Sequence, residues 1–272
     1  MSITSRQPQH LYLSDNAHCG VFPFHVEPFS EDYRGRLSWR FLGNHLLRCA
    51  SLHAGMCGFG YEDMQRIHHA WVLSRLVIDI HLMPITGQPY TIETWVNKTY
   101  RQFTDRLFAI TSVEGIPYGF ATSTWALIDI ESRHPMELAT LPNGGFAERI
   151  IAQDVPVKGF GHIRLKDKAM ARQLTAYYSD LDINGHVNSI RYIEMMLDLF
   201  PKEIHDKQHV ARLEVAYCNE AHSGDTLTLY TAQAPTPDTT LIEICKADNL
   251  PVVKAAITFA PDTGQAACPA QT

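Results

Sequence analysis

Asp182, Asn184, Gly185 and His186 crowd together in one short stretch of the chain. The stretch follows a run that is typical of a strand and precedes one that is typical of a helix. Its polar side chains would therefore lie beside the free backbone N–H groups at the start of that helix, where negative charge is favoured. Such a site can stabilise an oxyanion. Helix capping is the simpler explanation for Asp182 or Asn184 alone, but it gives no reason for the imidazole of His186.

The order of predicted elements around this stretch occurs twice. From about 37 to 56, apolar residues recur at spacings of three and four, which predicts a helix with one deeply buried side. A second helix is predicted from roughly 186 to 200. Each helix follows one strand-like run and precedes four more. The runs lie at 21–31, 71–82, 90–99, 107–113 and 119–130, and again at 173–180, 209–217, 226–233, 241–246 and 252–259.

The repeated order predicts two similar halves. Asp32-x-x-Gly35 matches Asp182-x-x-Gly185 in the sequence. A helix that is apolar over much of its circumference requires a sheet that wraps around it. We therefore predict an α+β tandem hotdog fold, in which an antiparallel sheet wraps each long central helix and the two sheets join edge to edge. The predicted units are the first half at 18–140, a linker at 141–159 and the second half at 160–262.

Several segments resemble the acyl-[acyl carrier protein] thioesterase family. DINGHVNSIRYIE at 182–194 resembles the family signature DxNxHVNNxxYI, and WVLSR at 71–75 resembles its WxLSR strand. Thr94-Trp95 is similar to its TW pair, and YCNE at 217–220 to its YRREC segment. The resemblance implies hydrolysis of fatty acyl thioesters on acyl carrier protein, which releases free fatty acid and ends chain elongation in fatty acid biosynthesis. An acyl-coenzyme A thioesterase of the hotdog superfamily is the alternative, and a noncatalytic acyl-binding hotdog is disfavoured by the retained polar residues.

The resemblance implies one catalytic set, in the second half, made of Asp182, Asn184, His186 and Glu220. Thioester hydrolysis needs a base for the attacking water and a donor for the oxyanion. Glu220 and His186 are expected to activate water jointly, and either could be the base. Asn184 would hold the water or donate to the carbonyl, Asp182 would orient its neighbours, and backbone N–H groups at 185–187 would receive the oxyanion.

A thiol mechanism is disfavoured, because Ala221 stands where plant members of the family often carry Cys. Cys218 lies nearby in the sequence, and a catalytic role for its thiol is the disfavoured alternative. We expect no metal site, since the chain has neither HExxH nor a Cys/His cluster, and no cofactor.

The resemblance also implies that the first half supplies the acyl-chain pocket. We expect Ala50, Ala54 and Met56 on the helix, and Trp95 on a strand, to line that pocket. Plain core packing is the alternative for each of these residues. His45 and His53 lie on the same apolar side and would fill the core or the acyl tunnel.

The charge of the chain limits the classes of partner that we expect it to bind. Lys and Arg number 23 against 29 Asp and Glu, and the net charge of −6 argues against nucleic acid or anionic lipid as a partner. An acidic carrier protein would need a local cluster of cations. The candidate clusters are Arg34, Arg36 and Arg40; Lys98, Arg101 and Arg106; and Lys166, Lys168 and Arg172.

The spacing of the cysteines and the length of the apolar runs indicate the cellular compartment that we expect for the protein. The six cysteines show no CxxC spacing, which favours a reduced, cytoplasmic protein. No secretory signal and no run of about 18 apolar residues occurs, so we expect neither export nor membrane insertion. Paired halves would make a monomer functional, and a homodimer remains an open alternative.

Overall fold

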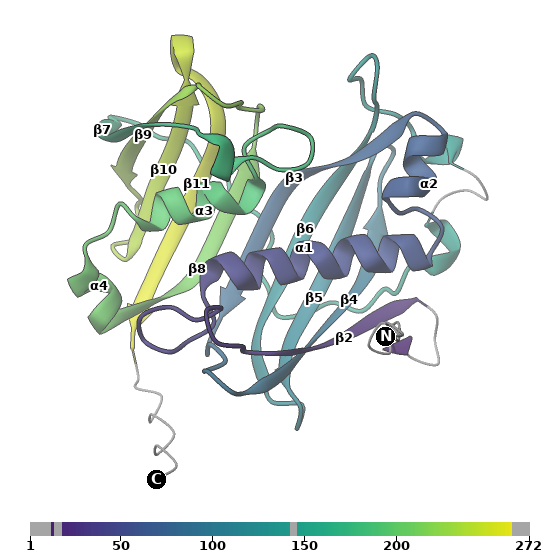
Figure 1. Cartoon of the computed structure of the whole chain (residues 1–272), viewed down its shortest axis with the longest axis horizontal. Coiled ribbons are helices and arrows are strands. Elements are labelled where there is room, and N and C mark those ends of the chain that lie inside the picture. Colours follow the sequence, from purple (N-terminus) through teal and green to yellow (C-terminus); the bar gives the residue numbers. More distant parts are fainter. Residues whose placement is uncertain (1–11, 14–17, 142–145, 263–272) are drawn as a thin grey trace, which may run out of the picture.

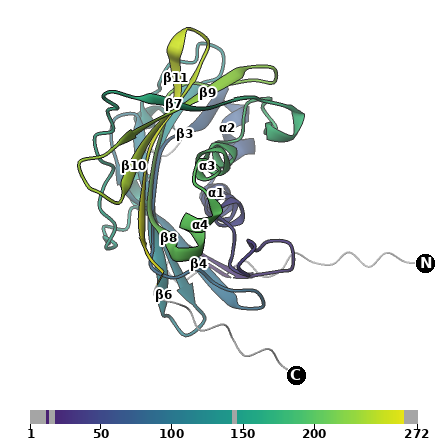
Figure 2. The same ribbon diagram turned by 90° about the vertical axis from the view of Figure 1, so that its left-hand side faces the viewer.

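The computed structural model describes residues 12–13, 18–141 and 146–262. The first residues of the chain, residues 142–145 of the predicted linker and Cys268 lie outside the described residues. Eleven strands form one antiparallel sheet, which curves around helices α1 (Trp39–Met56) and α3 (Ser189–Leu197) on its concave face (Figures 1 and 2). This arrangement confirms the α+β tandem hotdog that the sequence predicts.

The strands of the two halves occupy opposite sides of the sheet. The first half contributes β1 (Tyr12–Leu13), β2 (Cys19–His25), β3 (His69–Ile80), β4 (Pro89–Thr99), β5 (Phe103–Ser112) and β6 (Pro117–Asp129). The second half contributes β7 (Ala169–Thr175), β8 (Gln208–Tyr217), β9 (Thr226–Gln233), β10 (Thr239–Lys246) and β11 (Leu250–Pro261). The strand order is β1-β2-β4-β5-β6-β3-β8-β11-β10-β9-β7, so the halves meet at β3 and β8.

The junction between β3 and β8 is an antiparallel ladder that runs from Arg75 opposite Ala216 to Asp79 opposite Arg212. The Nη1 atom of Arg212 donates to both carboxylate oxygens of Asp79 at 2.8 Å. Because the ladder pairs backbone groups that would otherwise form two exposed sheet edges, it removes a surface prone to aggregation.

Helix α1 starts and ends where its sequence provides caps. The Oγ atom of Ser38 accepts a hydrogen bond from the backbone N of Phe41 at 3.4 Å. Beyond Met56, Gly58 has a φ of 80°, a conformation that favours glycine. The side of α1 that faces the sheet buries residues at spacings of three and four, namely Leu42, Leu46, Cys49, Ala50, His53 and Ala54.

Helix α3 begins later than the prediction of residue 186. Residues 182–187 form a turn, and Asn188 caps the helix by accepting a hydrogen bond from the N of Ile190 at 2.8 Å. The two helices approach closely at Gly43, where an added Cβ would lie 2.7 Å from Cδ1 of Ile190. A side chain at position 43 would force Ile190 to move, so glycine allows the close approach of the two helices.

Other boundaries differ from the predictions for local reasons. The strand predicted at 21–31 stops at His25, because the chain turns after it and Phe29 has a φ of 70°. The strand predicted at 173–180 gives way to a 3₁₀ turn at Tyr178–Asp180. The short helices α2 (Tyr61–Arg66) and α4 (Lys202–Lys207) lack a periodic apolar pattern and were not predicted.

The described part of the linker crosses the outer, convex face of the sheet. The backbone N of Ile151 donates to the carbonyl of Val96 at 3.0 Å. The indole Nε1 of Trp95 donates to the carbonyl of Gln153 at 3.1 Å. Among the described residues, no helix has the length and apolar character needed to span a bilayer.

Candidate active site

The polar stretch predicted from the sequence forms a tight turn before α3. Oδ1 of Asp182 accepts hydrogen bonds from the backbone N of Asn184 at 2.8 Å and of His186 at 3.2 Å. The N of Asp182 in turn donates to the carbonyl of His186 at 2.8 Å, and Gly185 takes a φ of 77°. Asp182 therefore organises the backbone of the turn, as an Asx turn does.

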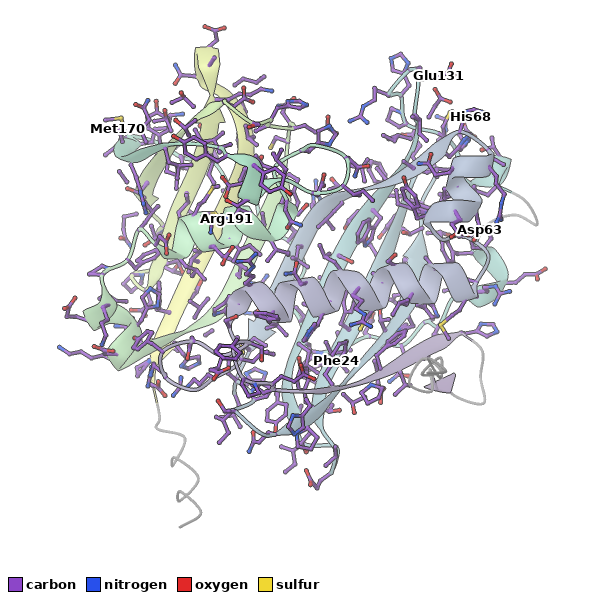
Figure 3. The ribbon with its side chains drawn as sticks, in the orientation of Figure 1. Phe24, Asp63, His68, Glu131, Met170 and Arg191 are labelled. Atoms are coloured by element: carbon purple, nitrogen blue, oxygen red, sulfur yellow. The ribbon has the colours of Figure 1, made fainter. Side chains whose placement is uncertain are left out.

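Two further contacts fix the turn against its surroundings. Arg191 on α3, labelled in Figure 3, donates from Nε to Oδ1 of the buried Asp180 at 2.7 Å. The hydroxyl of Tyr217, at the end of β8, donates to the carbonyl of Ser189 at 3.1 Å. The start of α3 is thereby held against the end of β8, from which Glu220 follows.

The backbone N–H groups expected to receive an oxyanion are already used inside the turn. Gly185 donates to the carbonyl of Asp182 at 3.0 Å, and Val187 donates to the carbonyl of Ala221 at 2.8 Å. The N–H of His186 is taken by the carboxylate of Asp182. In this structure the N–H groups at 185–187 are therefore not free to receive an oxyanion, contrary to the expectation from the sequence.

His186 and Glu220 face each other at the centre of the site. Nε2 of His186 lies 3.3 Å from Oε2 of Glu220, and both side chains are partly exposed. The backbone of Glu220 is held by Lys246, whose Nζ donates to its carbonyl at 2.6 Å. The structure thus brings together an imidazole and a carboxylate from two elements that are more than thirty positions apart in the sequence.

Arg133 joins this pair from the other half of the molecule. It lies in the loop after β6, the loop marked by Glu131 in Figure 3, and its Nη2 donates to Oε1 of Glu220. One carboxylate oxygen of Glu220 is thereby bound to a guanidinium, and the other faces His186. Sequence reasoning missed Arg133, because its loop carries no motif.

Asn184 connects the turn to a cavity in the first half. The cavity has a volume of about 190 Å³ and lies among α1, α2, β3, β5 and β6. Its apolar lining consists of Ala50, Ala54, Phe59, Met64, Ala70, Trp71, Trp125 and Phe146. Of the described residues that line it, Asn184 alone comes from the second half.

Two family models and one similar crystal structure identify the family of this chain. The models for the acyl-ACP thioesterase N-terminal and C-terminal domains match residues 23–140 and 163–260. The crystal structure of an acyl-ACP thioesterase from Bacteroides thetaiotaomicron is 38% identical, with a TM-score of 0.85, over 91% of this chain and 100% of that one. This chain belongs to the acyl-ACP thioesterase family.

Other members of the family are more distant. The oleoyl-acyl carrier protein thioesterase 1 of Arabidopsis thaliana is 27% identical over 211 residues, 71% of this chain and 58% of its own length. The chain thus spans about half the length of the curated relatives that it matches. The 12:0-ACP thioesterase of Umbellularia californica shares the fold at a TM-score of 0.78 and 20% identity, over 92% of this chain and 100% of that one.

Two of the four residues expected in the acyl pocket of this thioesterase family member line the cavity, namely Ala50 and Ala54. Met56 packs against the main hydrophobic core and does not border the cavity. Trp95 requires a correction: it points to the convex face, where it packs with Leu107 under the linker. Period-two alternation along β4 allows either face, and the linker that covers the far side could not be anticipated from the sequence.

Cys218 has no polar contact with His186 or Glu220 in the described structure. Its Sγ lies 3.9 Å from the carbonyl oxygen of Ala216. Partial burial raises the pKa of this thiol, so the thiolate is disfavoured at neutral pH. These observations support the expectation that the thiol is not the nucleophile.

His222 is a further neighbour that the sequence did not single out. Its ring packs edge-on against that of His186, with centroids 5.0 Å apart. One ligand atom each from His186, Glu220 and His222 lies within 4.8 Å of the others, so these three side chains could approach a divalent cation. Such an ion would have to compete with Arg133 for the carboxylate of Glu220.

Several residues of the predicted basic clusters form ion pairs within the chain. Arg34 and Arg36 both approach Asp262, at 2.6 and 2.8 Å. Lys168 forms an ion pair with Glu243. Carrier-protein docking on these clusters stays a prediction.

Proposed function

We propose that this chain hydrolyses fatty acyl thioesters of acyl carrier protein, releasing free fatty acid and ending chain elongation in fatty acid biosynthesis. The observation that carries the proposal is the position of Asn184, which borders the apolar cavity and shares its turn with His186. An acyl chain that occupied the cavity would bring its thioester carbonyl to this turn. Membership of the family supports acyl carrier protein as the carrier.

The His186–Glu220 pair takes the proton from the attacking water. Their facing atoms are 3.3 Å apart, so a proton that reaches the imidazole is stabilised by the carboxylate. Arg133 holds the second oxygen of Glu220 and so fixes the direction in which the carboxylate faces His186.

The side chain of Asn184 donates to the carbonyl oxygen as it becomes an oxyanion. The neighbouring backbone N–H groups are occupied, and the carboxamide N–H is a donor that lies beside the cavity. The leaving thiol resembles Cys in acidity, with a pKa of about 8.5, so it can depart as a thiolate without a strong general acid. Asp182 acts only by holding the turn that presents Asn184 and His186.

The test is hydrolysis of one acyl group carried either by acyl carrier protein or by coenzyme A. We expect a kcat/KM at least about tenfold higher on the protein carrier, since a docking surface adds binding energy that coenzyme A cannot use. Faster turnover on coenzyme A would replace the proposal with an acyl-coenzyme A thioesterase. Hydrolysis of neither, by protein with intact secondary structure, would remove the thioesterase assignment.

A further inference from the structure

Arg106 on β5 is a buried cation that the proposed mechanism does not use. The sequence groups it with Lys98 and Arg101 beside a loop, but the structure turns it into the interior. Only 4% of Arg106 is exposed, and the residue lines the cavity together with Ala50 and Ala54. A buried charge calls for an explanation, because burial of charge is costly and the other polar residues that line the cavity, Ser51, Gln65, His69, Thr104 and Asn184, carry no carboxylate.

Two neutral groups hold the guanidinium in place. Its Nη1 donates to Nδ1 of His53 at 2.8 Å and lies 3.2 Å from Oγ1 of Thr94. His53 therefore accepts with Nδ1 and carries its proton on Nε2, which faces Sγ of Cys57 at 3.8 Å. Burial, and then the charge of Arg106, lowers the pKa of His53 to about 3, so this imidazole is neutral under ordinary conditions.

No described carboxylate forms an ion pair with Arg106. Within the part of the chain that the structure describes, Arg106 forms no ion pair, and its hydrogen bonds use Nη1 alone. Burial raises the pKa of the nearby thiols of Cys49 and Cys57, which therefore remain protonated. Burial lowers the pKa of Arg106 only to about 10, so the guanidinium stays charged at neutral pH.

The described lining of the cavity offers no anionic partner for this charge. The described lining residues include no Asp or Glu. The indole N–H of Trp71 is bound to the carbonyl of Phe59 at 3.0 Å, and that of Trp125 to Oγ of Ser123 at 2.8 Å. The cavity thus combines largely apolar walls and a few neutral polar side chains with one cation, whose hydrogen bonds to the described residues use Nη1 alone.

We propose that Arg106 recognises an oxygen atom on the tail of the acyl group, so that this enzyme prefers acyl chains bearing a hydroxyl, oxo or carboxylate oxygen. The inference rests on the proposed function and specifies its substrate class. An acyl tail that fills the cavity displaces the water around Arg106. A plain hydrocarbon leaves the remaining donors unpaired, whereas an oxygen acceptor replaces the lost hydrogen bonds.

The size of the cavity sets the useful range of chain lengths. A cavity of about 150 Å³ can hold benzene, so the volume of about 190 Å³ has room for roughly eight carbon atoms of the tail. Matched substrates should therefore run from octanoyl to dodecanoyl. Each length is prepared on acyl carrier protein as the plain acyl group, with a terminal hydroxyl and with a terminal carboxylate.

The experiment measures kcat/KM for these matched sets with the wild-type enzyme and with Arg106→Met, which keeps length and removes charge. For at least one chain length, the wild type should favour an oxygenated chain over the plain one by about tenfold or more. Arg106→Met should lose this ratio and gain activity on the plain chain. Comparing the chains that end in a carboxylate with those that end in a hydroxyl separates charge recognition from hydrogen bonding, since only an anion gains from the full charge of Arg106.

The matched control is Arg101→Met, because Arg101 is exposed and donates to Glu137 at 2.7 Å. This variant should keep the wild-type ratio. If the wild type prefers plain chains at every length, the inference is overturned even when Arg106→Met fails to fold. If the wild type hydrolyses no acyl chain at all, the proposed function fails instead, so the two failures are distinguishable.

Discussion

The turns at 32–38 and 182–188 are built alike but carry different side chains. Oδ1 of Asp32 accepts from the N of Arg34 at 2.8 Å and of Arg36 at 3.1 Å, as Asp182 does in the second turn. The N of Leu37 donates to the carbonyl of Pro84 at 2.8 Å, which matches the bond from Val187 to Ala221. The backbone scaffold is therefore common to both halves.

The chemistry differs at the positions that the scaffold presents. Arg34 and Arg36 occupy the positions in the first turn that Asn184 and His186 occupy in the second. Glu220 comes directly before Ala221, the acceptor for the second turn. The corresponding residue in the first half, directly before Pro84, is Met83. The comparison teaches that Asp182 belongs to the shared scaffold, while Asn184, His186 and Glu220 belong to the site alone.

Removal of the pair unique to the second half should have the largest effect. His186→Ala and Glu220→Ala should each lower kcat/KM by at least about 10², the range for a positioned acid–base group, with little change in melting temperature. Steady-state hydrolysis and thermal unfolding measure the two effects. Arg36→Ala is the matched control in the first turn and should leave turnover intact; an equal loss there would end the distinction between the halves.

Asn184→Ala tests the side-chain oxyanion donor. With the backbone donors occupied, this change should reduce kcat by about 10² and leave the affinity for a product fatty acid nearly unchanged. Kinetics and fatty acid binding give the two values. A variant that lost affinity but kept kcat would show that Asn184 only lines the cavity.

The shared aspartates should contribute equally to stability and unequally to turnover. Asp32→Ala and Asp182→Ala each remove two hydrogen bonds from a turn before a helix and should each cost about 1 kcal/mol of unfolding free energy. Chemical denaturation measures this cost. Asp182→Ala should also lower kcat several-fold, because His186 and Asn184 lose their support, and Asp32→Ala should not. Full activity of Asp182→Ala would contradict the positioning role.

Arg133→Met should have a smaller effect, because its side chain is about half exposed and water screens its charge. We expect kcat to fall by about threefold to tenfold with KM little changed, and Arg133→Lys to recover part of the loss. Cys218→Ala should be nearly silent in the same assay. A loss as large as that of Glu220→Ala would make Arg133 a direct participant in the reaction.

Buried histidines of the first half should make the stability of the fold depend on pH. His53 on α1 is buried, and its pKa of about 3 lies well below the unfolded value of about 6.5. The unfolded chain binds the proton first as pH falls through this window, so the contribution of His53 to the unfolding free energy should drop by about 1 kcal/mol per pH unit. Urea unfolding between pH 6 and pH 4 measures the slope.

His53→Asn, whose amide oxygen can still accept from Arg106, should lower that slope by about 1 kcal/mol per pH unit. His45, whose pKa burial lowers to about 4, should supply a remaining slope. His162→Gln should leave the slope unchanged, because His162 is exposed. An unchanged slope in His53→Asn would show that His53 takes up its proton without loss of the fold.

The sequence predicted the fold well because periodicity and repetition are local signals. The spacing along α1 and the alternation in the strands around it follow directly from burial on one face. The predicted start of α3 at residue 186 is too early, because the turn organised by Asp182 has the polar residues that are typical of the first turn of a helix. Asn188 is the actual cap.

The candidate site could be predicted only where it lies in one stretch or matches a motif. Asn184 and His186 share a turn, and Glu220 came from resemblance. Arg133 reaches the site through a long-range contact between the halves, which no local pattern records. Trp95 and Arg106 were misplaced for a related reason, because what covers each face of the sheet depends on the path of the linker and on α1.

The ladder between β3 and β8 makes one polypeptide out of what a symmetric dimer would assemble from two copies. In a symmetric dimer every substitution appears twice, so a residue that improves one pocket also alters the other. Here Met83 and Glu220, or Arg36 and His186, can change independently. We expect that this independence lets one half carry the reaction centre while the other half selects the acyl chain, a division of roles that identical subunits cannot reach.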